Sequence, residues 1–248
     1  MLQNNNTTYR LLSVALLVMI FQAGCTTTTV KQTSLLPTET GTGFAEITDS
    51  NQIPGFRDDY GRIELLYAVD NSREYFKKVK SYPDTFKSIG FTPEKQIDTL
   101  NLFRDGYVSS KSPQELSEFI AKNFRIFQAN GKGSEGTVQF TGYGFAVFSD
   151  NVKRKWDHTV YNTAIGFPAT QMRSIATGEG LFPLGGLAFA VIETGEQKGK
   201  SFFVLGHDTK STIKTAAKAD VFLGIGKEAL HKAENFNTSG KLYYLLKR

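Results

Sequence analysis

The sequence has few of the residues that form covalent or metal cross-links. Its 248 residues include 1 cysteine and 3 histidines. A single cysteine excludes a disulfide within the chain, and so few thiols and imidazoles leave almost no ligands for a Cys/His metal site. We therefore expect neither a metal nor an organic cofactor.

Excess charge of one sign is also small. Lys and Arg number 29 against 24 Asp and Glu, which gives a net charge of +5. This excess is too small to predict a nucleic-acid partner, and it suits a protein that works beside an anionic polymer or a membrane surface. With 40% hydrophobic residues, the chain can bury a core in one or at most two compact domains.

Residues 1–24 have the pattern of a secretory signal peptide. Met1–Arg10 is polar and ends in a positive charge, and Leu11–Phe21 is an apolar run. A run of this length is too short to cross the ~30 Å hydrocarbon core of a bilayer as a helix, but it matches the hydrophobic region of a leader.

The apolar run ends at Gln22–Cys25 (QAGC), where small residues precede the cysteine. This junction resembles the lipobox of bacterial lipoproteins, which are cleaved before a lipidated cysteine. With Thr26 directly after the cysteine, the junction resembles that of lipoproteins that are sorted to the outer membrane. The resemblance implies a lipid anchor on Cys25 and a position on the outer membrane facing the periplasm. An ordinary secretory leader with an incidental Cys25 is the alternative.

Residues 25–53 form the lipidated Cys and a flexible tether in this interpretation. The segment is rich in Thr, Ser, Gly and Pro and has too few apolar residues to build a packed element. We expect it to hold the folded part of the chain away from the membrane.

Residues 54–130 show three helical patterns. Ile63–Lys78 has apolar residues at three- and four-residue steps, and Asp70–Ser72 is expected to break or cap it. Thr92–Pro93 and Ser112–Pro113 each join an N-cap residue to a proline at the first helical position. The third helix is expected to carry one apolar stripe made of Leu116, Phe119, Ile120 and Phe124.

Residues 131–248 change to short β-like runs separated by turn residues, with one short helix at Lys227–Glu234. Helices followed by many short strands predict an α+β fold, in which a helical N-terminal region leads into a small barrel.

Several short blocks follow a known pattern in their order along the chain. They are Glu135–Tyr143 (EGTVQFTGY), Arg173–Ala176 (RSIA), Leu181–Gly185 (LFPLG), Asp208–Lys214 (DTKSTIK), Asp220–Gly226 (DVFLGIG) and Gly240–Leu246 (GKLYYLL). Together they resemble the 3D (three-aspartate) domain of the membrane-bound lytic murein transglycosylase A family. The resemblance implies a six-stranded double-psi β-barrel over residues 131–248.

The resemblance also implies cleavage of the β-1,4 bond between N-acetylmuramic acid and N-acetylglucosamine in peptidoglycan, with a 1,6-anhydro product. Hydrolytic glycosidases need two carboxylates. In a lytic transglycosylase the C6 hydroxyl of the muramic acid attacks, so one carboxylate can act first as acid and then as base. Asp220 matches the acid/base residue of the family, and Asp208 matches a second aspartate that we interpret as an organiser of the site.

Thr141, Tyr143 and Lys214 are candidate substrate-binding residues. Each has a simpler interpretation, as a strand threonine, a core tyrosine and a solvated loop lysine. Outside the resemblance, an aspartate beside turn-forming residues usually caps a turn, and this alternative applies to Asp208 and Asp220 as well.

The chain departs from the family pattern at three places. The first aspartate of the family falls on Gly178, with Glu179 beside it, and Lys210, Ser211 and Thr215 replace glycines. The large insert domain of the family is missing from the sequence before Arg173. We therefore expect a shallow, open site.

Two functions remain open from the sequence. One is a lipid-anchored lytic transglycosylase that acts on peptidoglycan glycan strands. The other is a non-catalytic glycan-binding or scaffold lipoprotein of the cell envelope, which would tie the outer membrane to the wall or dock a cell-wall enzyme. A nuclease or redox role has no support in the residues.

Overall fold

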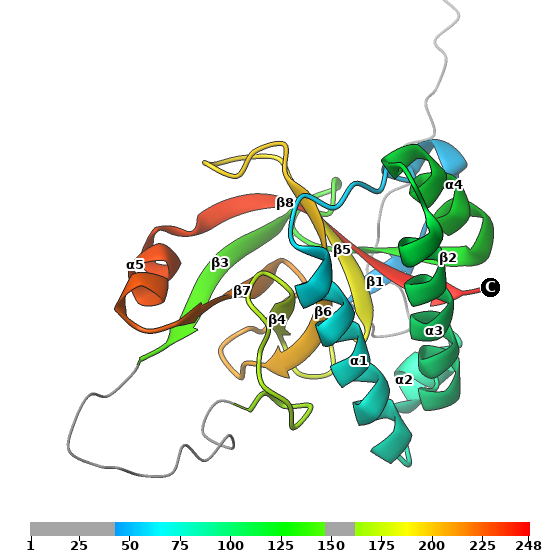
Figure 1. Cartoon of the computed structure of the whole chain (residues 1–248), viewed down its shortest axis with the longest axis horizontal. Helices are drawn as coiled ribbons and strands as arrows, with labels where there is room; N and C mark the ends of the chain where they lie inside the picture. Colours follow the sequence, from blue (N-terminus) through cyan, green and yellow to red (C-terminus); the bar gives the residue numbers. More distant parts are fainter. Residues whose placement is uncertain (1–42, 147–161) are drawn as a thin grey trace, which may run out of the picture. The chain divides into compact units, whose positions relative to one another are not determined.

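The computed structural model describes residues 43–146 and 162–248 (Figure 1). The predicted signal peptide, Cys25 and most of the predicted tether lie outside the described residues. In the described part, no helix combines the length and apolarity needed to cross a membrane.

Five α-helices and one short 3-10 helix are present in the described ranges. The α-helices are α1 (Arg62–Lys78), α2 (Asp84–Lys87), α3 (Pro93–Ser109), α4 (Pro113–Asn123) and α5 (Lys227–Asn235), and η1 is Ser50–Gln52. In Figure 1, α1 to α4 gather on one side of the strands, whereas α5 packs against β3 and β7 on the other.

The strands form one closed barrel with two additional strands. They are β1 (Phe44–Glu46), β2 (Phe124–Ala129), β3 (Val138–Phe145), β4 (Ser174–Thr177), β5 (Leu187–Ile192), β6 (Ser201–Thr209), β7 (Lys218–Ile225) and β8 (Asn237–Lys247). The order β8-β3-β7-β4-β6-β5 closes because β5 also pairs with β8, and β3–β7 and β4–β6 are parallel. This confirms the predicted α+β class with a six-stranded barrel.

The two predicted N-caps begin α3 and α4. The Thr92 hydroxyl accepts a hydrogen bond from the Lys95 amide at 3.2 Å, and the Ser112 hydroxyl accepts one from the Glu115 amide at 3.2 Å. A proline follows each cap, because its missing N–H would have no partner in the first turn.

The sequence prediction is wrong at two places in the N-terminal half. β1 lies inside the predicted tether and pairs with β2, and its Phe44 stacks on Phe182 and Tyr244 in the core. β2 lies in the region predicted to be helical, with Phe124 placed on a helical stripe. Antiparallel pairing of β2 with β8 overrides the local helical spacing there.

The predicted break at Asp70–Ser72 does not occur, because α1 runs through it. Ser72 is buried and its hydroxyl lies 3.0 Å from Nε2 of His207 on β6, while the Ser174 hydroxyl of β4 lies 2.7 Å from Nδ1. Burial lowers the pKa of His207 to about 3 from its ordinary value of 6.5. The imidazole is therefore neutral in the folded chain near neutral pH.

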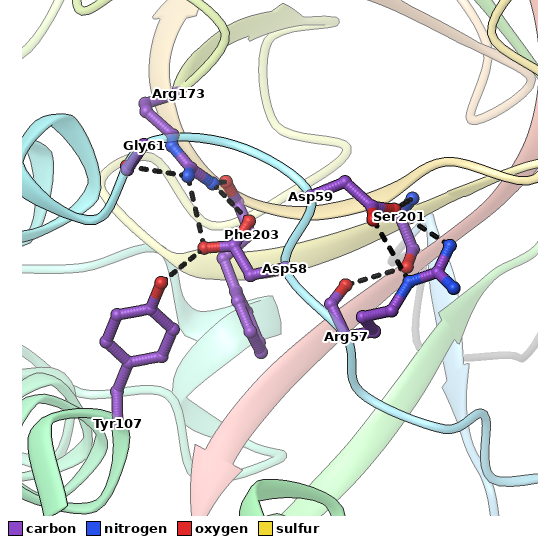
Figure 2. Close-up of polar contacts among 8 residues, drawn as sticks. All are labelled: Arg57, Asp58, Asp59, Gly61, Tyr107, Arg173, Ser201 and Phe203. Carbon is purple, nitrogen blue, oxygen red and sulfur yellow. Dashed lines mark hydrogen bonds and ion pairs between the residues drawn. The ribbon is translucent and has the colours of Figure 1, made fainter. Parts of the chain in front are cut away.

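A buried ion pair joins the segment before α1 to the barrel (Figure 2). Arg173 donates to Asp58 through both terminal nitrogens, at 2.8 and 3.1 Å, and also to the carbonyls of Phe203 and Gly61. The Tyr107 hydroxyl of α3 donates to the same carboxylate at 2.7 Å. The Arg173 side chain is 0% exposed and that of Asp58 is 4% exposed, so neither charge reaches water.

Next to this pair, Arg57 and Asp59 hold the same segment on the first residue of β6. The Ser201 amide donates to Asp59 at 2.7 Å, and the Ser201 hydroxyl donates to the carbonyl of Arg57 at 2.7 Å (Figure 2). The segment Arg57–Asp59, which leads into α1, is thus attached to β6 through both its first and its last residue.

We predict that Asp58→Ala lowers the free energy of unfolding by about 3–5 kcal/mol, because it leaves the Arg173 guanidinium buried without its counter-charge. Urea unfolding at pH 7 measures the loss. The matched control is Glu74→Ala, which removes an exposed pair with Lys77 at 2.5 Å and should leave stability unchanged. Equal, small effects of the two substitutions would contradict the role of the buried pair.

His207 predicts a specific dependence of stability on pH. Its pKa is lower in the folded than in the unfolded chain, so the unfolded chain binds a proton first as the pH falls below about 6.5. This group therefore removes about 1.4 kcal/mol of stability per pH unit between pH 6 and pH 4. Urea unfolding across this range should show a shallower loss in His207→Asn than in the wild type. The exposed control His231→Asn should keep the wild-type slope.

Candidate active site

Asp220 lies on β7, where three strands run side by side. It pairs in register with Thr141 of the parallel strand β3 and with Ala176 of the antiparallel strand β4. The residue is 6% exposed. Because side chains that are in register on neighbouring strands lie on the same face of the sheet, the Thr141 hydroxyl meets the Asp220 carboxylate directly.

Both oxygens of the Asp220 carboxylate have partners. Oδ1 accepts a short hydrogen bond from the Thr141 hydroxyl. Oδ2 lies 2.5 Å from Nζ of Lys210, and Nζ of Lys218 lies 3.8 Å from Oδ1. Two ammonium groups and one hydroxyl therefore surround the carboxylate.

Lys210 follows the last residue of β6, Thr209. Its amide donates to the Thr177 carbonyl at 2.9 Å, and its carbonyl accepts from the Ile213 amide at 3.0 Å. These bonds direct its side chain across the site, where Nζ lies 4.4 Å from the centre of the Tyr143 ring. One ammonium group thus contacts both the carboxylate of Asp220 and the face of Tyr143.

Tyr143 packs on Phe222 of β7, with ring centres 5.3 Å apart. Its hydroxyl is buried and has no hydrogen-bond partner among the described residues. Burial raises the pKa of Tyr143, and the negative charges of Asp208 and Asp220 raise it further. The phenol thus remains protonated and can donate a hydrogen bond, and both aspartates lie near enough to influence it.

Asp208 lies one residue before the end of β6. Its Oδ1 accepts from the Thr209 amide at 2.9 Å and from the Ala164 amide at 3.2 Å. It therefore holds the loop before Arg173 against β6. Neither of these contacts involves Asp220, and the role of Asp208 as an organiser of the site stays a prediction.

The other predicted site residues divide into two groups. The structure brings Thr141 and Tyr143 to Asp220, as described. Lys214 is exposed, and none of the hydrogen bonds or ion pairs found in the described residues involves it. Lys210 and Lys218 were expected to surround the aspartates, as solvated loop lysines or as groups that attract carboxylates of peptidoglycan, but Lys210 was not among the predicted substrate-binding residues. The signal that could have identified it is a charged residue where the family pattern has a glycine, two positions after Asp208.

The position of the missing aspartate, Gly178, is closed by its neighbours. A Cβ atom there would lie 2.5 Å from the Ile213 carbonyl oxygen and 2.4 Å from Leu181 Cδ1. Neither contact is possible without movement of the chain, so this backbone excludes an aspartate. The adjacent Glu179 is exposed.

A metal-binding arrangement is not present in the described part of the chain, where no three His, Cys, Asp or Glu side chains converge. Cys25, the predicted lipidation site, lies outside the described residues. The chemistry that the site offers is thus that of a buried carboxylate with hydroxyl and ammonium donors around it.

Comparison with known proteins confirms the predicted resemblance. Residues 173–246 match the family model of the 3D domain. This part of the chain holds β4 to β8 together with Asp208, Lys210 and Asp220. No curated protein matches the chain by sequence.

The fold is similar to solved structures of lytic transglycosylases. A membrane-bound lytic murein transglycosylase from Agrobacterium tumefaciens superposes with a TM-score of 0.58 at 14% identity, over 83% of this chain and 98% of that chain. MltA from E. coli with bound chitohexaose gives 0.56 at 11% identity, over 82% and 94%. LtgG, a lytic transglycosylase of Burkholderia pseudomallei, gives 0.51 at 13% identity, over 83% and 96%. Residues 173–246 thus match the 3D domain, and the chain has a fold similar to that of these lytic transglycosylases.

Proposed function

We propose that this protein binds the glycan strands of peptidoglycan and cleaves the β-1,4 bond between N-acetylmuramic acid and N-acetylglucosamine. The observation that carries the proposal is the buried carboxylate of Asp220 beside the hydroxyl of Thr141 and the phenol of Tyr143. The match to the 3D domain and the likeness of fold to lytic transglycosylases support it.

Asp220 is the acid/base residue in this proposal. Its carboxyl group donates a proton to the glycosidic oxygen as the bond from that oxygen to C1 of the muramic acid breaks. The resulting carboxylate then takes the proton of the C6 hydroxyl as O6 bonds to C1. One proton is given and one is recovered, so no water is consumed and a single carboxyl group completes the reaction.

Three neighbours support Asp220 in this role. The Thr141 hydroxyl fixes the orientation of the carboxylate, since it donates to one of its oxygens. The hydroxyl of Tyr143, which has no partner in the described part of the chain, is available to bond a sugar hydroxyl or an N-acetyl group. Asp208 keeps the loop at Ala164 in place beside the site.

A non-catalytic role in binding the glycan is the second candidate. One observation favours it: the chain has closed the position at which the family pattern has its first aspartate, because the Ile213 carbonyl occupies the space beside Gly178. Such a protein would tie the envelope to the wall or dock a cell-wall enzyme without cutting the glycan.

We further propose that Cys25 carries the lipid anchor and that the protein lies on the outer membrane, facing the periplasm. The support is the QAGC junction after the apolar run. In cells, Cys25→Ser should abolish incorporation of a labelled fatty acid and release the protein from the membrane fraction. Labelling that persists in Cys25→Ser would overturn the anchor and favour an ordinary leader.

We predict that Asp220→Asn reduces the release of anhydro-muropeptides from purified sacculi by at least ~100-fold. Asparagine keeps the volume and the acceptor for Thr141, but it cannot donate the proton. Chromatography of the soluble products measures the release. The exposed control Asp98→Asn should retain wild-type release.

Binding to sacculi should survive in Asp220→Asn, which a pull-down checks at the same time. If the wild type binds sacculi but releases no anhydro product, the second candidate holds. Undiminished release by Asp220→Asn would exclude Asp220 as the acid/base residue.

A further inference from the structure

A cavity of about 690 Å³ lies at one end of the barrel, between α5 and the turn that joins β5 to β6. β4 runs antiparallel to β7 and β8 runs antiparallel to β5, so the ends of β5 and β7 meet the starts of β4 and β8 there. The volume is within the range of small-molecule sites, which is ~300–1000 Å³. None of the residues assigned to the candidate active site lines this cavity.

The cavity and Asp220 lie on opposite faces of β7. Leu223, which lines the cavity, comes three residues after Asp220, and side chains at that spacing in a strand point to opposite faces. The neighbouring strand agrees. A Cβ atom on Gly142 would lie 2.7 Å from Leu223 Cδ1 and 2.7 Å from Cα of Ala233 in α5, whereas the adjacent Thr141 contacts Asp220. The cavity is therefore a second concave site.

The inner wall of the cavity is apolar and aromatic. Leu223 is buried, and Met172, Phe236 and Tyr60 are half-buried. The rim is polar and carries four amide side chains, namely Gln171, Gln197, Asn235 and Asn237. An apolar wall with a few polar groups at its edge is typical of sites that bind a small organic ligand.

The amides of the rim have hydrogen-bonding groups to spare. Oε1 of Gln197 accepts from the Tyr60 hydroxyl at 3.0 Å, and Oδ1 of Asn237 accepts from Gln139 at 3.0 Å. Among the described residues, no partner is found for the NH₂ groups of Gln197 and Asn237 or for the side chain of Gln171. Because an amide side chain has both donors and an acceptor, this rim can bond hydroxyl and acetamido groups alike.

Charge on the rim is nearly balanced. Nζ of Lys232 pairs with Glu228 at 2.6 Å, Glu196 is exposed, and the exposed His231 is the remaining basic group. The cavity thus has no surplus of cations to attract a ligand with several carboxylates, such as a stem peptide. It suits a neutral ligand.

Met172 holds a strained backbone conformation at the wall of this cavity. It is the one non-glycine residue in the described ranges with a positive φ, at 58°. Glycine adopts this conformation without strain, whereas a residue with a side chain does so at a cost. The Met172 amide donates to the Phe222 carbonyl at 2.8 Å, and the next residue, Arg173, is held by Asp58. Such strain is concentrated at functional sites, and here it places an apolar side chain against the cavity.

We propose that this cavity binds an N-acetylated amino sugar, at a second site separate from that of Asp220. The amide rim matches the hydroxyl and acetamido groups of such a sugar, and the apolar wall matches its ring and its acetyl methyl group. The choice of this sugar rests on the proposed function, whereas the existence of the site does not. A site that binds the glycan without cutting it keeps the protein on the wall while the other site releases its product.

The test uses the β-1,4-linked tetrasaccharide of N-acetylglucosamine as the probe. It is added to the isotope-labelled full chain carrying Asp220→Asn, and NMR follows the side-chain amides of Gln171, Gln197, Asn235 and Asn237. We expect these signals to shift, and the same titration gives the affinity. Gln171→Ala should weaken binding by about 5-fold, because it removes one hydrogen-bonding side chain. The matched control is Gln114→Ala, which removes an exposed amide from α4 and should leave the affinity unchanged.

Met172→Gly separates a binding role from a structural one. It removes the apolar side chain and relieves the positive φ, so we expect about 10-fold weaker binding with a urea midpoint of unfolding that is unchanged or raised. Met172→Leu keeps an apolar side chain and should retain the affinity. If Met172→Gly lowers the midpoint, Gln171→Ala decides, because its exposed side chain supports no contact of the fold.

Unshifted amides at the rim would overturn the proposal, as would full affinity in Gln171→Ala. Shifts caused by a free stem peptide and not by the tetrasaccharide would overturn the sugar as the ligand. The failure of the proposed function looks different: the wild type would release no anhydro-muropeptides from sacculi while the rim amides still shift. Release that depends on Asp220, with no shift at the rim, would leave the proposed function standing and exclude the second site.

Discussion

The ion pair between Arg173 and Asp58 determines how the two halves of the chain assemble. A buried guanidinium without its carboxylate is costly, so the pair holds the segment before α1 on the barrel in the folded chain. That segment leads into α1, whose Ser72 contacts His207 on β6. Asp208, the next residue, bonds the loop at Ala164. The pair thus supports the elements that place one of the two aspartates of the site.

The sequence predicts the parts of this fold that depend on local chemistry. Capping by Thr92 and Ser112 begins two helices where predicted, because a cap and the following proline act within a single turn. The prediction from sequence fails at Phe124, where the helical spacing of apolar residues continues but pairing with β8 makes a strand. The predicted break at Asp70–Ser72 is wrong for a similar reason. Ser72 can lie inside α1 because its hydroxyl contacts His207, which is 135 positions away in the sequence. Partners so distant in sequence leave no local signal.

The candidate site was predictable where the family pattern has the same residue and not where it differs. Asp220 meets Thr141 because β3 and β7 are parallel and in register, which is a property of the barrel. Lys210 takes its place because its amide donates to the Thr177 carbonyl of β4 and its carbonyl accepts from the Ile213 amide, which closes a turn from Lys210 to Ile213. A motif comparison reveals only that a glycine has been replaced. Which atoms the new side chain contacts is decided by the path of that turn.

The two main departures from the family pattern arise from one stretch of backbone. The turn from Lys210 to Ile213 directs the Lys210 ammonium to Asp220, and the same turn brings the Ile213 carbonyl against Gly178. An aspartate at position 178 would collide with this turn, so the loss of that carboxylate and the gain of the lysine belong together. The path of this turn therefore accounts both for the lysine beside Asp220 and for the lack of room for a side chain at position 178.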